Sequence, residues 1–332
     1  MRPAVDVGGL VEGVLEGRRA QVARAITLVE SSRPDHRDRA SELITAITPH
    51  TGRSVRVGIT GVPGAGKSTF IDAMGVRLIE RGAKVGVVAV DPSSRRTGGS
   101  ILGDRTRMAE LTAREEAFVR PSPSGKHLGG VARATRESML ILEAAGFDVL
   151  IVETVGVGQN EIAVSEMVDT FLLLTLAGAG DQLQGIKRGI LELADVIAVN
   201  KADGDGEGRA RVAARDLSAA MRLMLPGKNV RRPPVLTCSA QTGAGLDEVW
   251  QAVLDHRAHL EAEGSLAARR AQQQEDWMWA MVDAHLEEGV RHTPSVRPVR
   301  AEIEEAVRVG ELSAVDGAAR ILSLYAADLA AR

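Results

Sequence analysis

Residues 55–70 read VRVGITGVPGAGKSTF, and this stretch decides the fold. Gly61 is followed after four residues by Gly66, Lys67 and Ser68, which is the spacing G-x-x-x-x-G-K-[ST] of a phosphate-binding loop. An apolar β-branched run precedes the loop and an amphipathic stretch follows it, so strand, loop and helix come in the required order. This context argues against the alternative, a glycine turn that binds nothing.

Each residue type in the loop has a physical task. Glycines let the backbone come close to a phosphate, and the helix that follows presents free N–H groups and the positive end of its dipole. The ammonium of Lys67 is a point charge for the β and γ phosphates, and the hydroxyl of Ser68 can ligate Mg²⁺. The candidate phosphate-binding residues are Gly61, Gly64, Ala65, Gly66, Lys67, Ser68 and Thr69.

Apolar β-branched runs recur downstream, with amphipathic stretches between most of them. This alternation predicts an α/β protein with a mainly parallel sheet covered by helices on both faces. Ligands of such sheets bind at the carboxyl ends of the strands. The predicted strands are 55–60, 85–90, 149–152, 170–176, 196–199 and 235–237.

Both ends of the chain lack strand-like runs. Apolar spacing predicts that residues 7–50 are helical, and Pro34 favours two helices over one. The tail predicts helices at 265–291, 299–309 and 312–331. We therefore expect an N-terminal helical segment at 1–52, a nucleotide-binding domain at 53–262 and a C-terminal helical arm at 263–332.

Composition narrows the function classes. With 41 Lys plus Arg against 44 Asp plus Glu, the net charge is -3, and no basic block indicates nucleic-acid binding. The single cysteine, Cys238, excludes an internal disulfide and a CxxC metal site. No secretory signal and no membrane-spanning run is visible. We expect a cytoplasmic protein that binds neither nucleic acid nor membrane.

A second motif indicates the base. Residues 195–203 read DVIAVNKAD and place Asn200, Lys201 and Asp203 at the end of an apolar run. An ionised Asp203 can accept from both guanine donors, N1–H and the N2 amine, whereas adenine lacks this pair. Asn200 can bond the other purine edge and tie this loop to the phosphate loop, and the stem of Lys201 can cover the base. A helix-capping Asn/Asp loop is the alternative.

The stretch PVLTCSAQTGAG at 234–245 supports the guanine interpretation. It places Ser239 and Ala240 after another apolar run, where small residues allow a backbone N–H to reach guanine O6. The order of the three motifs along the chain makes the capping alternative weaker than it would be for the second motif alone.

Carboxylates follow two more predicted strands. VVAVDPSS at 87–94 supplies Asp91, and VLIVETVGVGQ at 149–159 supplies Glu153, where GTPases usually have the Asp of an Asp-x-x-Gly. Mg²⁺ uses one or two carboxylates together with phosphates and waters, so Asp91, Asp104 and Glu153 are candidates beside Ser68. For Asp104, a helix N-cap before 105–113 is an equal alternative.

The residue that orients the attacking water is the least defined part. Some GTPases carry Gln directly after the Asp-x-x-Gly glycine, whereas this chain has the apolar Val157 there. Gln159 lies two residues further on, so Lys67, Glu153 and Gln159 are the catalytic candidates. We expect slow intrinsic turnover that a partner stimulates.

Three Gly-rich segments follow predicted strands at 91–104, 154–160 and 177–188. Such segments can be ordered by the γ-phosphate and released on hydrolysis. We expect the last to couple nucleotide state to a partner rather than to act in catalysis. Ordinary surface loops are the alternative.

Together the motifs GVPGAGKST, VAVDPSS, ETVGVGQ, NKAD and SAQTG resemble the MeaB/ArgK family of methylmalonyl-CoA-mutase-associated GTPases. The resemblance covers essentially the whole chain. It implies a P-loop GTPase of the signal-recognition-particle and MinD-like branch, which binds GTP or GDP with Mg²⁺. It further implies a chaperone of the adenosylcobalamin-dependent methylmalonyl-CoA mutase, one that gates cofactor loading and protects the mutase from inactivation. Homodimerisation through the arm, and a third switch at 177–188, are also implied.

Rival functions are a nickel- or other metallocentre-assembly GTPase, a kinase of a transport system and a signal-recognition-type targeting module. The first usually has clustered Cys or His, whereas Cys238 stands alone and His256 and His259 fit a solvated helix face. No feature indicates a phosphate acceptor for the second. The third would need a Met-rich or basic surface, and the methionines here are dispersed.

Overall fold

The computed structural model describes residues 5–31, 33–90, 108–121, 128–154, 160–178, 188–227 and 230–331. Its contacts divide the chain into two compact units, Met1–Gln273 and Gln274–Arg332. The first unit contains the sheet and the phosphate-binding loop, and the described residues of the second form helices joined by short turns.

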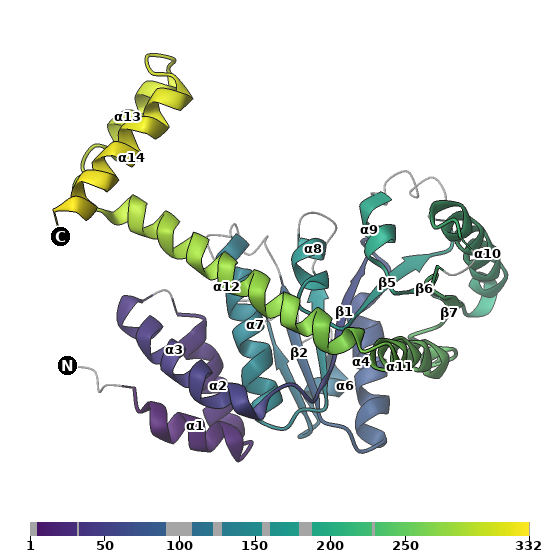
Figure 1. Cartoon of the computed structure of the whole chain (residues 1–332). Coiled ribbons are helices and arrows are strands. Elements are labelled where there is room, and N and C mark those ends of the chain that lie inside the picture. The colour runs from purple at the N-terminus through teal and green to yellow at the C-terminus, as the bar shows by residue number, and fades with distance from the viewer. Residues whose placement is uncertain are drawn as a thin grey trace. The chain divides into compact units, whose positions relative to one another are not determined.

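The first unit is built on one seven-stranded sheet in which every strand pairs in parallel, which confirms the predicted α/β class. The strand order is β3-β2-β4-β1-β5-β6-β7, so β1 lies at the centre between β4 and β5. Figure 1 shows β2, β1, β5, β6 and β7 in this order across the sheet. All carboxyl ends therefore lie at one edge of the sheet. The strands are β1 (Val55–Gly61), β2 (Val85–Val90), β3 (Ala117–Arg120), β4 (Val149–Thr154), β5 (Thr170–Leu176), β6 (Val196–Asn200) and β7 (Val235–Thr237).

One strand was missing from the sequence prediction. Strand β3 has only four residues and lies at the edge of the sheet next to β2. Its sequence, AFVR, is too short for a strand to be recognised from periodicity, and two glutamates precede it. This segment becomes a strand because it pairs with the edge of β2, and a single sequence does not show that pairing.

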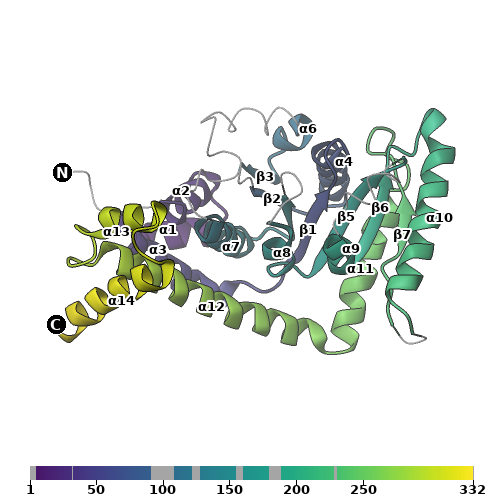
Figure 2. The same ribbon diagram turned by 90° about the horizontal axis from the view of Figure 1, so that it is seen from above.

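Separate apolar cores cover the two faces of the sheet, as a parallel sheet requires. On one face, Val57 and Ile59 pack with residues of α4 (Lys67–Glu80). On the other, Leu150 and Val152 pack with residues of α7 (Leu128–Ala144). Figure 2 shows these two helices on opposite sides of the strands. The remaining helices of this unit are α6 (Ala109–Thr112), α8 (Asn160–Ser165), α9 (Arg188–Leu193), α10 (Glu207–Met224) and α11 (Leu246–Ala262), with 3-10 turns at Thr48–His50 and Gly204–Gly206.

The N-terminal segment forms three α-helices rather than the two that were predicted: α1 (Val7–Leu15), α2 (Arg19–Val29) and α3 (Pro34–Ile47). The unpredicted break lies at Gly17, whose φ of +69° ends α1 in a left-handed turn. Their apolar faces join the core on the α7 side, where Val14 and Ile26 are buried with Leu142. These helices are therefore part of the first unit.

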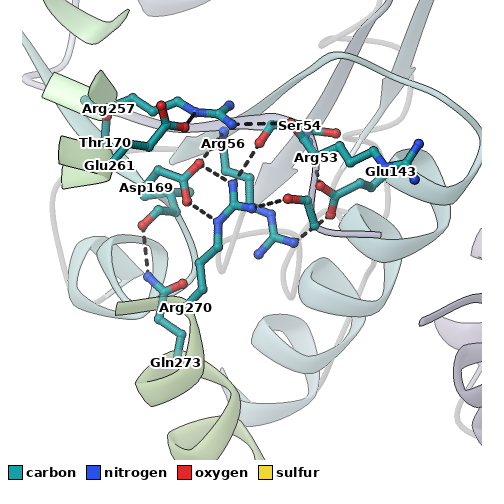
Figure 3. A network of polar contacts seen from close by, with 12 residues as sticks. Arg53, Ser54, Arg56, Glu143, Asp169, Thr170, Arg257, Glu261, Arg270 and Gln273 are labelled. Carbon is teal, nitrogen blue, oxygen red and sulfur yellow. Dashed lines mark hydrogen bonds and ion pairs between the residues drawn. The ribbon is translucent and has the colours of Figure 1, made fainter. Parts of the chain in front are cut away.

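A buried ionic network closes the amino end of the sheet, opposite the strand ends that carry the motifs (Figure 3). Both oxygens of Asp169 accept from Arg270, at 2.7 and 2.8 Å, and one also accepts from the backbone N–H of Arg56 at 3.0 Å. The guanidinium of Arg56 donates to Glu143 at 2.6 Å. Burial would raise the pKa of Glu143, but the charge and hydrogen bond of Arg56 lower it, so this carboxyl stays ionised.

Arg270 belongs to α12 (Ser265–His292), whose first turns are held to the sheet. One turn further along, the Gln273 amide donates to the carbonyl of Val168 at 2.9 Å. The Arg136 guanidinium donates to the carbonyls of Gln273 and Glu166. These bonds explain why the first unit ends at residue 273.

The second unit holds the rest of α12, then α13 (Arg300–Arg308) and α14 (Ala314–Ala330). All three helices of the tail match the predicted ranges to within two residues. Ser313 caps α14 by accepting from the N–H of Asp316 at 3.0 Å. Within the described ranges, no helix is both long and apolar enough to cross a bilayer.

Candidate nucleotide-binding site

The phosphate-binding loop connects the central strand β1 to helix α4. A Cβ on Gly61 would lie 2.1 Å from the carbonyl oxygen of Leu174 in β5, so only glycine fits where the loop leaves the sheet. Gly66 precedes α4 with a φ of +82°, a left-handed angle that glycine adopts without strain. The first N–H groups of α4 therefore face the carboxyl edge of the sheet, as anion binding requires.

Lys67 is the first residue of α4, and its side chain folds back over the loop. Its ammonium donates to the carbonyl of Gly61 at 2.9 Å. This bond holds the charge at the carboxyl end of β1, where the sequence places the β and γ phosphates.

Ser68 and Glu153 meet at this edge although they lie 85 residues apart. The Ser68 hydroxyl donates to a carboxylate oxygen of Glu153 at 3.0 Å, and Glu153 is only 4% exposed. A hydroxyl and a carboxylate are both oxygen ligands of the kind that Mg²⁺ prefers. The two side chains lie close enough together to bind one metal ion, which fits the predicted role in Mg²⁺ binding.

Asn200, the last residue of β6, joins the second motif to the phosphate loop. Its side-chain amide donates to the carbonyl of Ala65 at 2.8 Å, and Asn200 is almost fully buried. Its oxygen accepts from the backbone N–H of Ala240 at 3.0 Å. Asn200 therefore holds its own loop against both the phosphate loop and the loop that contains Ala240. The bond to the phosphate loop was expected from the sequence, and the bond to Ala240 was not.

The carboxylate of Asp203 is oriented by Ser239. The buried hydroxyl of Ser239 donates to one oxygen of Asp203 and accepts from the N–H of Thr242. A carboxylate oxygen has two lone pairs, so the oxygen bound to Ser239 can still accept from a base. Among the described non-glycine residues, only Lys201 has a positive φ, 60°, and it lies in this loop. Such a backbone angle is typical of functional loops.

The stretch that contains Ser239 and Ala240 is already internally bonded. The backbone N–H of Ala240 is one of the groups that were expected to reach guanine O6. In the structure it donates to the side-chain oxygen of Asn200. The Cys238 thiol also lies 3.8 Å from the Asn200 oxygen, and burial raises the pKa of this thiol to about 12. Cys238 is therefore a neutral packing group beside the base site.

Comparison with known proteins gives the family of this site. The family described as "Methylmalonyl Co-A mutase-associated GTPase MeaB" matches residues 22–295. The chain belongs to this family. A probable GTPase of Mycobacterium tuberculosis is 58% identical, over 96% of this chain and 95% of that protein. The mouse protein named methylmalonic aciduria type A homolog, mitochondrial, is 42% identical over 92% and 76% of the two chains.

A solved structure gives the same result for the fold. The crystal structure of a protein named LAO/AO transport system kinase is 38% identical, covers 96% of each chain and superposes with a TM-score of 0.73. With the motifs in place at one edge of the sheet, this MeaB-family member is a P-loop GTPase, as its sequence predicted.

Part of the predicted site of this MeaB-family GTPase lies outside the described residues. Asp91, Asp104 and Gln159 fall in undescribed stretches, as do most of the segments 91–104, 154–160 and 177–188. Their roles in Mg²⁺ binding, catalysis and coupling remain predictions.

Two contacts, one in the site and one behind it, were not predicted. One is the Ser239 hydroxyl on Asp203, and the other is a hydroxyl pair in which Thr154 donates to Thr60 at 2.8 Å. Both contacts involve small polar residues at or just after strand ends. Each of these residues lies beside a motif residue in the sequence, and this position is the only feature from which the contacts could have been predicted.

Proposed function

We propose that this GTPase is a chaperone of an adenosylcobalamin-dependent methylmalonyl-CoA mutase, and that it gates loading of the cofactor and protects the mutase from inactivation. Two names support the mutase part: the family description and the disease named in the mouse relative. The observation that carries the nucleotide part is Asn200, which bonds to both the phosphate loop and the Ser239–Ala240 loop. The protein acts in the cytoplasm, as a homodimer.

The proposed roles follow the geometry at the strand ends. The loop from Gly61 to Thr69 binds the phosphates, Lys67 supplies the charge, and Asp203 reads guanine with Ser239 holding it in place. Ser68 and Glu153, with Asp91 and Asp104, hold Mg²⁺, which neutralises charge on the phosphates when bound. Glu153 and Gln159 orient the attacking water. The segment 177–188 couples the nucleotide state to the mutase.

Assembly of a nickel or other metallocentre, and phosphorylation of a transport protein, are the other candidate functions. The solved relative carries the name of a kinase of the second kind. The Asp203–Ser239 contact favours a guanine nucleotide, and the family description favours the mutase.

The test is recovery of partners from an extract of the protein's own cells, with the tagged full chain loaded with GDP or with a non-hydrolysable GTP analogue. A B12-dependent mutase recovered in amounts that depend on the nucleotide is the expected result. Asp203→Asn loaded with a xanthosine analogue is the matched control, because it restores binding while guanine nucleotides in the extract no longer compete. Recovery of a metalloenzyme precursor or a transport protein instead would overturn the proposal.

A further inference from the structure

The strand ends that carry Glu153 and Gly61 separate just below the site. Backbone pairing between β1 and β4 runs from Val55 with Val149 to Ile59 with Glu153. Beyond it, β4 continues on β2, and β1 continues on β5 as far as Gly61. The central pair of strands thus loses its ladder at the point where the two halves of the site begin.

A side-chain hydrogen bond replaces the ladder there. Thr154 donates to the hydroxyl of Thr60 at 2.8 Å, and its hydroxyl lies 3.4 Å from the carbonyl of Ile59. Both threonines are 0% exposed. Thr60 immediately precedes Gly61, whose carbonyl accepts from Lys67, and Thr154 immediately follows Glu153, which accepts from Ser68.

The hydroxyl pair lies behind the site rather than in it. Successive side chains of a strand point to opposite faces, so Thr154 points away from the face that Glu153 shares with Ser68 on α4. Neither threonine hydroxyl has solvent access to bind a nucleotide or metal. Any effect of the pair on the reaction must pass through the positions of Glu153 and Gly61.

We propose that Thr154 and Thr60 are positioning residues for GTP hydrolysis, which set the separation between the Glu153 end of β4 and the phosphate loop. The inference rests on the proposed role of Glu153 at the metal. On the other sides both strand ends are held by ladder pairing: Gly61 pairs with Leu174 in β5, and Thr154 pairs with Val90 in β2. Between β4 and β1, the bond between the two hydroxyls lies just beyond the last ladder pair and joins the two strand ends.

The test is a double-mutant cycle of Thr60→Val and Thr154→Val. Valine keeps the shape of threonine and removes the hydroxyl. Each single variant should lower kcat by about tenfold and raise the Mg²⁺ concentration for half-maximal rate, because small misplacements of catalytic groups are costly. GTP affinity measured without hydrolysis should stay within about twofold, since the base and phosphate contacts remain. The double variant should be no slower than the worse single, because both hydroxyls act through one bond.

Thr154→Ser is the conservative control, because it keeps the hydroxyl and should restore kcat. The variant Glu153→Gln distinguishes failure of the proposed role of Glu153 from failure of the positioning role of the threonines. If Glu153→Gln hydrolyses GTP at the wild-type rate, the role of Glu153 is wrong. If Glu153→Gln is impaired but Thr154→Val has wild-type kcat and Mg²⁺ dependence, the positioning role is wrong. Equal impairment of Thr154→Ser and Thr154→Val, or additive effects in the double variant, would also overturn it.

Discussion

At the scale of single residues, the choice of base is expected to depend on Asp203. Guanine offers an amine where xanthine has a carbonyl, so Asp203→Asn supplies a donor that matches xanthine. The variant should lose several kcal/mol of GTP binding, because polar groups are left unpaired, and should gain affinity for XTP. Ser239 can still bond the amide oxygen, so the side chain should keep its place.

The measurement is competitive binding of GTP and XTP to the wild type and to Asp203→Asn. Asp205→Asn, two residues further in an exposed position, is the control and should bind like the wild type. A variant that prefers GTP by the wild-type margin would refute the base assignment.

Lys67 gives a second prediction at this scale. Lys67→Ala removes the ammonium that bonds to the Gly61 carbonyl, while the backbone N–H groups of the loop remain. Hydrolysis should fall at least about 100-fold, because charge developing on the phosphates loses a fixed donor, and nucleotide affinity should weaken. Single-turnover hydrolysis is the measurement, and the exposed Lys84→Ala is the control. Undiminished hydrolysis would show that Lys67 is not the phosphate-binding lysine.

The spacing of residues in the sequence identifies motifs whose members lie within a few positions of one another. It does not identify contacts between residues on different strands of the sheet. The phosphate loop is one turn joined to one helix, so Lys67 and Ser68 follow from the spacing alone. The bonds of Ser239 to Asp203 and of Thr154 to Thr60 join residues 36 and 94 positions apart. Those pairs form because strands distant in sequence are neighbours in the sheet, which a single sequence does not specify.

At the scale of elements, Arg270 fixes the start of α12 to the amino end of the sheet. Its partner Asp169 has no exposed side-chain surface, so Arg270→Ala leaves a buried carboxylate that keeps the hydrogen bond from the backbone N–H of Arg56 but loses its counter-charge. Removing one partner of a buried ion pair costs about 3–5 kcal/mol. Urea unfolding should show this loss. Arg39→Ala, which breaks the exposed pair with Glu42, should change stability by less than about 1 kcal/mol. Equal losses in the two variants would contradict the role given to Arg270.

His256, which was expected from the sequence to lie on a solvated helix face, is buried instead and links α11 to the same end of the sheet. His256 lies 2.9 Å from the Thr170 hydroxyl and 3.3 Å from a carboxylate oxygen of Asp195. Burial, followed by the charges of Arg231, Arg269 and His259, lowers its pKa from 6.5 to about 4, and Asp169 opposes this only in part. The neutral ring can accept from Thr170 and donate to Asp195.

Stability should therefore fall as the pH falls through this window. Between about pH 6.5 and 4 the unfolded chain binds a proton at His256 that the folded chain does not, so up to about 1.4 kcal/mol is lost per pH unit. The raised pKa of buried Asp195 acts in the opposite direction at pH values above its ordinary pKa of 3.8, because the folded chain there binds a proton more readily than the unfolded chain. Urea midpoints at pH 7 and pH 5 should differ less in His256→Gln than in the wild type. Parallel pH profiles would show that His256 does not titrate in this way.

The sequence predicted the long elements well and the short ones poorly. Strands such as β5 and the arm helices carry periodic apolar patterns, and their predicted ranges agree with the structure. Strand β3 and the turn at Gly17 depend on a neighbouring edge and on one backbone angle. Arg270 appeared as one charge in a polar helix, and its role depends on a carboxylate 101 residues away.

At the scale of the whole molecule, the second unit is expected to hold two copies of the chain together. In α12 beyond Gln273, Met278, Val282 and Leu286 follow each other at four-residue spacing, with Trp279 beside them. All four are exposed, Trp279 by 57%. Apolar side chains gathered on one helix face favour burial against another chain, and a second copy offers the same face.

The deletion that tests this must stop after Gln273. The predicted arm, 263–332, begins before Arg270, so removing all of it would also break the bonds that α12 makes with the sheet. A chain ending at residue 273 keeps those bonds and the whole nucleotide site. It should bind GTP with wild-type affinity and elute as a monomer. The full-length double variant Val282→Asp/Leu286→Asp should also be monomeric, because a charge costs several kcal/mol when buried unpaired. Light scattering that finds both variants as dimers, like the wild type, would place the self-association surface on the first unit instead.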